Sequence, residues 1–203
     1  MERIEEKNSV KVSGRIVSEP VFSHEVLGEK FYAFSLEVKR PSGNVDYVPV
    51  IVSEKRIDIG MLLRAAYISV YGSFRSYNKH SESGFRLILN VFASRIEPVE
   101  AGTYDNEITI VGYICKEPTA RITPLGKEIT DVLIAVNRSC GNSDYIPCIA
   151  WGKHSRYAAA LPVGSCVRLG GRIQSREYVK KTGDTEETRT AYEVSANYIT
   201  LCE

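Results

Sequence analysis

The amino-acid sequence repeats itself at a fixed spacing, and the repeat limits the chain to folds that two similar domains can build. A shift of 98 residues aligns the two halves without a gap up to about residue 53. Most coinciding residues are turn formers or have special backbone preferences, which chance does not keep at one offset. We therefore predict two domains, residues 1–100 (copy one) and residues 104–203 (copy two). The coinciding residues are Asn8 and Asn106, Gly14 and Gly112, Glu19-Pro20 and Glu117-Pro118, Gly28 and Gly126, Arg40 and Arg138, Gly43-Asn44 and Gly141-Asn142, Asp46-Tyr47 and Asp144-Tyr145, and Pro49 and Pro147.

Each copy has the pattern of a small β-barrel. Apolar and polar residues alternate in residues 10–17 and 108–114, which is the period of a strand with one buried face. Gly14 and Gly112 lie inside these runs and predict a bulge or a sharp bend. Five strands with one short helix between the third and fourth describe an OB-fold, so the predicted fold class is all-β, two tandem five-stranded Greek-key barrels. The other strands and closing hairpins are expected at 31–40, 46–53, 66–72 and 74–92 in copy one and at 130–138, 144–151, 166–171 and 174–199 in copy two, and the helices at 56–66 and 152–164.

Charge and composition exclude some classes of protein. The net charge of +1 neither indicates a nucleic-acid binder nor excludes one, because a basic groove can be offset elsewhere. No apolar run approaches the ~20 residues that cross a bilayer, and the charged first residues have no signal-peptide core, so we expect a cytoplasmic protein. The five cysteines form no C-x-x-C pair and are expected to be reduced. We expect neither a cofactor nor a metal.

Copy two resembles the single-stranded DNA-binding proteins of bacteria over nearly its whole length. The matching stretches are residues 108–129, residues 132–138 and residues 144–178, in which Trp-Gly-Lys ends the third strand. No single stretch is specific, but their order and spacing together are. Copy one keeps the opening VKVSGRIVSEP and the DYVP strand, but has Ser-Glu-Lys where copy two has Trp-Gly-Lys. Copy one is therefore the diverged copy.

The resemblance implies single-strand binding without sequence preference, by aromatic rings that stack on bases and cations that contact phosphates. In copy two the matching aromatics are Tyr145, Trp151 and Tyr178, whereas the family's fourth aromatic falls near Ser139-Cys140. In copy one Tyr47 matches Tyr145, Tyr77 roughly matches Tyr178, and Ser53 replaces Trp151. The expected phosphate contacts are Arg138, Lys153, Arg172, Arg176, Lys180 and Lys181 in copy two and Arg40, Arg75 and Lys79 in copy one. We expect Phe31, Phe34, Tyr67, Phe92 and Tyr192 to be core residues.

The resemblance also implies partners. Proteins of this type usually present four barrels, which two-barrel chains reach as a homodimer with closed two-fold symmetry. The chain ends at Glu203 without the acidic, glycine-rich tail that recruits repair enzymes, so we expect no such recruitment and no membrane partner.

Two other functions compete with this one. A primosome-like OB module used for protein contacts fits the near-neutral charge and the missing aromatics. An enzyme would need clustered carboxylates, a catalytic triad or a phosphate loop, and none is present in the sequence. Asp46 and Asp144 recur at the start of the third strand, where a turn-forming role explains them. We therefore do not expect an enzyme.

Overall fold

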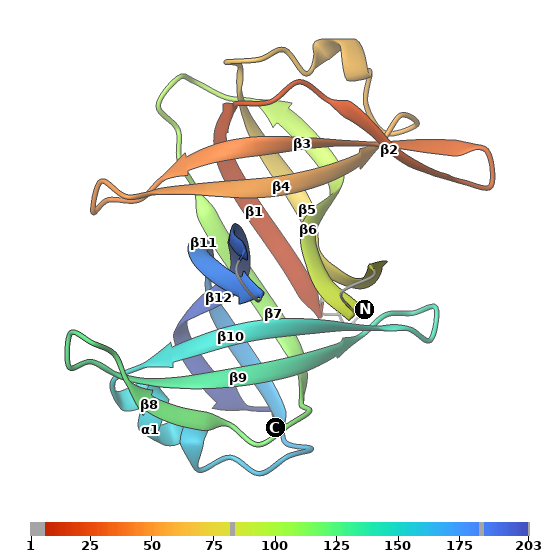
Figure 1. Cartoon of the computed structure of the whole chain (residues 1–203). Helices are drawn as coiled ribbons and strands as arrows, with labels where there is room; N and C mark the ends of the chain where they lie inside the picture. Colours follow the sequence, from red (N-terminus) through yellow and green to blue (C-terminus); the bar gives the residue numbers. More distant parts are fainter. Residues whose placement is uncertain (1–6, 82–83, 183–184, 203) are drawn as a thin grey trace.

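The computed structural model describes residues 7–81, 84–182 and 185–202, and shows two β-barrels side by side (Figure 1). Copy one contains six strands and a single-turn 3-10 helix (Ile59–Met61). Copy two contains six strands and one α-helix, α1 (Lys153–Ala159). The strands are β1 (Asn8–Ile16), β2 (Val21–Val26), β3 (Glu29–Lys39), β4 (Val45–Ser53), β5 (Tyr67–Ser81), β6 (Gly84–Pro98), β7 (Asn106–Ile114), β8 (Thr119–Ile122), β9 (Glu128–Asn137), β10 (Ser143–Trp151), β11 (Cys166–Thr182) and β12 (Thr185–Leu201).

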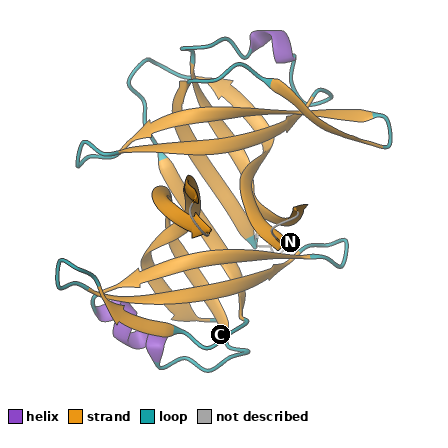
Figure 2. Ribbon diagram, in the orientation of Figure 1, coloured by secondary structure: helices purple, strands orange, loops and turns teal. Residues whose placement is uncertain are grey.

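Each barrel closes in the same way. In copy one β1 pairs with β5 on one side and, at its end, with β3, while β4 and β6 pair in parallel. In copy two β7 pairs with β11 and β9, and β10 pairs in parallel with β12. The structural neighbours reported below share this fold, so the predicted all-β architecture of two OB-fold barrels is confirmed. The two short helices lie at opposite ends of the molecule (Figure 2).

Two short strands were not predicted. β2 and β8 each precede the expected second strand and pair only with it. Every residue of both strands is exposed, so neither carries the alternation of apolar and polar residues by which a half-buried strand is recognised. The predicted helix of copy one is reduced to the single turn at Ile59–Met61.

Glycines permit close approach of strands inside the barrels. A Cβ atom at Gly14 would lie 2.3 Å from the Glu37 carbonyl oxygen, and one at Gly112 would lie 2.5 Å from the Ala135 carbonyl oxygen. At these points β1 and β7 leave one partner strand for another, and only a residue without a side chain fits. The bulges lie elsewhere, at the Tyr71/Gly72 and Gly170/Gly171 steps and, in the β2–β3 pairing, between Phe22 and His24.

The two barrels are joined edge to edge through their first strands. β1 and β7 run antiparallel, with Val10 opposite Ile108 at the centre of the register. Because Val10 and Ile108 are equivalent positions of the repeat, the junction has approximate two-fold symmetry. The pairing makes one continuous twelve-stranded sheet.

A second set of contacts crosses the junction from the long hairpins, which extend from each barrel toward the other (Figure 1). The Arg40 guanidinium is paired with both carboxylate oxygens of the fully buried Asp46. Asp46 Oδ1 also accepts a hydrogen bond of 2.8 Å from the Ser175 backbone N–H of copy two. The Tyr47 N–H in turn donates to Ser175 Oγ at 3.2 Å. We call this set of contacts the first clasp.

The second clasp repeats the same contacts with the copies exchanged. Arg138 is paired with both carboxylate oxygens of the buried Asp144. Asp144 Oδ1 accepts a hydrogen bond of 2.6 Å from the Ser76 N–H of copy one, and the Tyr145 N–H donates to Ser76 Oγ at 2.7 Å. Arg138 also donates to the Ser76 carbonyl oxygen at 3.0 Å. Each copy thus binds the hairpin of the other through a buried ion pair.

The core of each barrel is built from the inward-facing residues of its strands, such as Val50 and Phe74 in copy one and Ile146 and Ile173 in copy two. Within the described ranges, no helix has the length and apolar character needed to cross a membrane.

The clasp geometry predicts a large effect of Asp144→Asn on stability. The substitution leaves the Arg138 guanidinium without its charged partner at a buried junction, where such a loss costs about 3–5 kcal/mol. Asp131→Asn is the matched control, because it breaks a pair with Arg121 whose side chains are 45% and 37% exposed, worth about 0–1 kcal/mol. Urea unfolding measures both losses of unfolding free energy. Equal losses for the two variants would contradict the buried clasp.

Candidate nucleic-acid interface

Strand alternation turns one set of copy-two side chains away from the barrel interior. On β10, Ile146 and Cys148 are buried in the core, whereas Tyr145 is 44% exposed and Trp151 is half-buried. On β11, Ile173 faces the core. Arg172, Arg176 and Tyr178 lie at alternate positions on the opposite face of the strand, so their side chains point outward. We define the outer face of copy two as the surface of β10, β12 and β11 that carries Tyr145, Trp151, Arg172, Arg176 and Tyr178.

Trp151 and Arg172 line the same hollow of the outer face, which has a volume of about 640 Å³. The Trp151 Nε1–H donates to Ser195 Oγ at 3.1 Å, which fixes the orientation of the indole ring. Arg172 Nε is buried and has no hydrogen-bond partner among the described residues. Burial and, secondly, the positive charge of Arg40 lower the pKa of Arg172. An anion in this hollow would accept hydrogen bonds from the exposed nitrogens of the Arg172 guanidinium. Its negative charge would offset the cost of burying Arg172 and the repulsion from Arg40.

Arg176 and Tyr178 extend the outer face along the hairpin. The Arg176 guanidinium carbon lies 6.0 Å from the Tyr178 ring centroid, and Arg176 Nε lies 3.8 Å from a Glu193 carboxylate oxygen. Arg176 is largely exposed and Tyr178 is 37% exposed, and Lys153 at the start of α1 is exposed as well. Lys180 and Lys181 are in β11, but their side chains fall outside the described residues. The five residues that define the face thus lie on one side of the barrel, as their two-residue spacing requires.

In copy one the corresponding surface carries Arg75, Tyr77 and Lys79, which alternate along β5. Tyr47 and Tyr77 are each 50% exposed. Gly72 and Gly171 occupy the same register against β1 and β7, so Tyr77 is structurally equivalent to Arg176 and not to Tyr178. The approximate sequence match between Tyr77 and Tyr178 is therefore two positions out of register.

Arg40 and Arg138 have partners that the sequence analysis did not foresee. Both were predicted to contact phosphates, but the structure places each in a clasp with Asp46 or Asp144. The hydrogen bonds that both arginines donate to these carboxylates raise the pKa of their guanidinium groups. The carboxylates, which we took for turn formers, are 0% and 2% exposed. The signal was in the repeat, because arginine and aspartate recur six residues apart in both copies.

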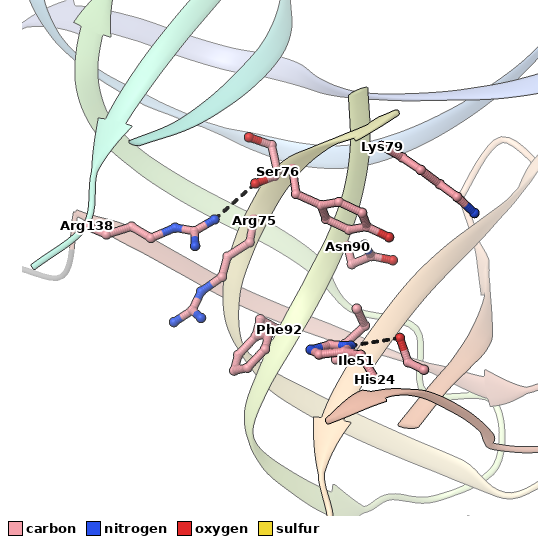
Figure 3. A pocket seen from close by; sticks show the side chains of 10 residues that line it. His24, Ile51, Arg75, Ser76, Lys79, Asn90, Phe92 and Arg138 are labelled. Carbon is pink, nitrogen blue, oxygen red and sulfur yellow. Dashed lines mark hydrogen bonds between the residues drawn. The ribbon is translucent and has the colours of Figure 1, made fainter. Parts of the chain in front are cut away.

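Phe92 is a second residue whose place differs from the expectation. We predicted a core position, but β6 buries Leu89, Val91 and Ala93, and Phe92 lies half-buried on the outer side. There it lines a pocket with Arg75, whose guanidinium carbon lies 4.0 Å from the ring centroid (Figure 3). The alternation of Leu89, Val91 and Ala93 could have shown this from the sequence.

Comparison with known proteins agrees with this geometry. The Single-strand binding protein family matches residues 105–202, which are copy two. Over 85 residues the chain is 36% identical to single-stranded DNA-binding protein B of Bacillus subtilis, covering 38% of this chain and 75% of that protein. The chain belongs to the single-strand binding protein family.

The chain covers a smaller share of other relatives in the family. Single-stranded DNA-binding protein 2 of Listeria innocua is also 36% identical over 85 residues, covering 38% of this chain and 54% of that protein. The chain thus spans about half the length of most of the curated relatives it matches. The crystal structure of the single-stranded DNA binding protein from Thermus aquaticus matches 97% of this chain and 93% of that one, with a TM-score of 0.76 and 20% identity. That likeness shows that the two-barrel fold is shared.

The structure predicts which of the five cysteines reacts first with an alkylating reagent. Cys140 is the exposed cysteine among the five, and it lies near the position of the family's fourth aromatic. The backbone N–H of Asn142 lowers the pKa of its thiol by stabilising the thiolate, whereas burial raises the pKa of the Cys148 thiol. We expect iodoacetamide to alkylate Cys140 first, with a pH midpoint below that of an ordinary cysteine, as measured by mass spectrometry. A fast phase that survives in Cys140→Ser would show that another thiol reacts.

Proposed function

We propose that the protein binds single-stranded DNA without sequence preference and acts in replication, recombination or repair. The observation that carries the proposal is the outer face of copy two, where Trp151, Tyr145 and Tyr178 lie on the same side of a family barrel as Arg172 and Arg176. Aromatic rings stack on bases of any identity, and arginines contact the phosphates between them. This combination is what a strand binder requires, and it needs no catalytic group. We therefore propose a binding protein, not an enzyme.

The near-neutral net charge is compatible with this function. Several acidic side chains close to the interface are already paired: Asp46 and Asp144 in the clasps, and Glu193 with Gln174 at 2.7 Å. The clasp arginines balance the charges of Asp46 and Asp144, and Arg176 Nε lies 3.8 Å from the Glu193 carboxylate. The local field that a phosphate meets is set by nearby groups because more distant charges are screened within about 8 Å at physiological salt.

We propose that copy two contributes more of the affinity than copy one. Copy two presents Trp151 where copy one has Ser53, and the ring that copy one carries on the adjacent strand, Phe92, is already covered by the Arg75 guanidinium. Each base stack is worth about 1–3 kcal/mol, so one less accessible ring changes the affinity of a barrel by about an order of magnitude. A cytoplasmic location, where single strands arise during replication, fits this role.

The proposed function predicts quenching of Trp151, the single tryptophan, on titration with oligo-dT. Trp151→Leu should weaken binding about 5- to 100-fold, measured by polarisation of a labelled oligonucleotide, because one stacking platform is lost. Tyr157→Leu is the matched control, since this exposed aromatic lies on α1 and does not line the hollow of Trp151. Unquenched emission and no binding to oligo-dT would favour the rival function, an OB module for protein contacts.

We propose further that two chains associate as a homodimer, bringing four barrels together. Closed two-fold symmetry is the commonest arrangement for soluble oligomers, and it gives the barrel number that the family resemblance implies. Size-exclusion chromatography with light scattering should give a mass about twice the 22.7 kDa of one chain. A monomer at micromolar concentration would rule the four-barrel assembly out and leave the strand-binding proposal in place.

A further inference from the structure

A pocket of about 500 Å³ lies where copy one meets copy two, and we call it the junction pocket (Figure 3). Nine of its lining residues come from copy one and one, Arg138, comes from copy two. Its volume falls in the range of small-molecule sites, about 300–1,000 Å³. The lining residues are Ser23, His24, Ile51, Arg75, Ser76, Tyr77, Lys79, Asn90, Phe92 and Arg138.

The floor of the junction pocket is aromatic. Phe92 contacts Phe31 with ring centroids 5.5 Å apart, and Phe31 stacks on His24 at 4.7 Å with the two planes 7° apart. Phe92 is opposite Ile51 in the β4–β6 register, and Ser195 is opposite Ile149 in the β10–β12 register. Phe92 therefore occupies the position of Ser195, next to the strand where copy two has Trp151. Copy one lacks that tryptophan but has a ring on the adjacent strand.

The walls of the junction pocket are cationic. Arg75 and Lys79 come from β5, and Arg138 is held at the rim by the second clasp. None of the ten lining residues is acidic. Burial and then repulsion by the Arg138 guanidinium lower the pKa of Arg75, while the charge of Asp144 acts in the opposite direction. A bound anion would relieve this repulsion, and a phosphodiester fits two guanidinium groups well because arginine binds phosphate oxygens in a bidentate manner.

We propose that the junction pocket holds one nucleotide of the bound strand, with its phosphate between Arg75 and Arg138 and its base stacked on the layer that Phe92 and the Arg75 guanidinium form together. This inference rests on the proposed single-strand binding and assigns a site within it. The planar Arg75 guanidinium over Phe92 offers a further face for a base, and the Asn90 amide can donate to and accept from a base edge. Because Arg138 belongs to copy two, the site is complete only when the two copies are docked, and the strand passes from one barrel to the other at this point.

The equivalent region of copy two is built differently. The shared register places Gln174 at the position of Arg75 and Ser195 at the position of Phe92. Gln174 is buried and hydrogen-bonded to Glu193. The arginine of that side is Arg172, two residues earlier on β11 and next to Trp151. The junction pocket is therefore particular to copy one and is not one of two identical sites.

Salt-dependent binding of oligo-dT tests the inference. Loss of one phosphate contact in Arg75→Gln should make the slope of log affinity against log salt about 0.7 less steep. Arg75→Lys keeps the charge and should keep the slope, which a purely structural role of the stacked guanidinium would not predict. Phe92→Leu should weaken binding about tenfold at an unchanged slope, because it removes a stacking face and no charge. The matched control is Arg95→Gln, whose guanidinium carbon lies 3.9 Å from the Tyr71 ring centroid outside the pocket, and it should change neither.

The outcomes separate this inference from the proposed function. If the native protein binds oligo-dT and quenches Trp151, but Arg75→Gln has the native slope, the junction site is wrong and strand binding stands. If Arg75→Gln and Arg95→Gln change the slope equally, the effect is not specific to the pocket and the site is also wrong. If the native protein does not bind at all, both are overturned. An unchanged far-UV circular dichroism spectrum and thermal unfolding midpoint of each free variant show that copy one, which carries the substitutions, is still folded.

Discussion

The buried pairing of a guanidinium with a carboxylate at the junction is the contact on which the arrangement of the two barrels depends. Burying such a pair is costly unless its remaining hydrogen-bonding groups are also satisfied. Asp46 and Asp144 meet this condition only because the backbone N–H of a serine in the opposite copy donates to them. Each ion pair is therefore satisfied in the docked state alone, which makes the clasps specific for one relative orientation of the barrels.

That orientation determines how the outer surfaces of the two barrels lie relative to each other. The β1–β7 pairing sets the barrels edge to edge, and the clasps fix the hairpins that carry Arg75 and Arg176. A strand binder whose barrels were free to move would pay the entropy of ordering them on every binding event. Here that entropy is lost during folding. Arg138 of the second clasp also lines the junction pocket, so one structural device joins the copies and contributes to the proposed binding surface.

The sequence allowed the architecture to be predicted but only part of the site. The repeat and the two-residue period predict two barrels, because each reports contacts inside one copy. The clasps join Ser76 and Ser175 to the opposite copy, and no local pattern reports such a contact. β2 was missed for a different reason: a fully exposed strand has no buried face to impose a period. Phe92 was misplaced because large aromatics are usually core residues.

Comparison of the copies position by position shows that the proposed binding groups lie at different positions in the two copies. Ser53 in copy one is at the position equivalent to Trp151 in copy two, whereas Phe92 is at the position equivalent to Ser195. Likewise Arg75 corresponds to Gln174, and the arginine of copy two is two residues away. Stacking needs only a π-face of any origin beside a cation, so a ring and a guanidinium can move between neighbouring strands and still meet a base and its phosphate. A motif comparison aligns one strand at a time, so it counts such a move as the loss of a ring and the loss of a cation. The divergence of copy one is therefore greater in sequence than in the chemistry of its surface.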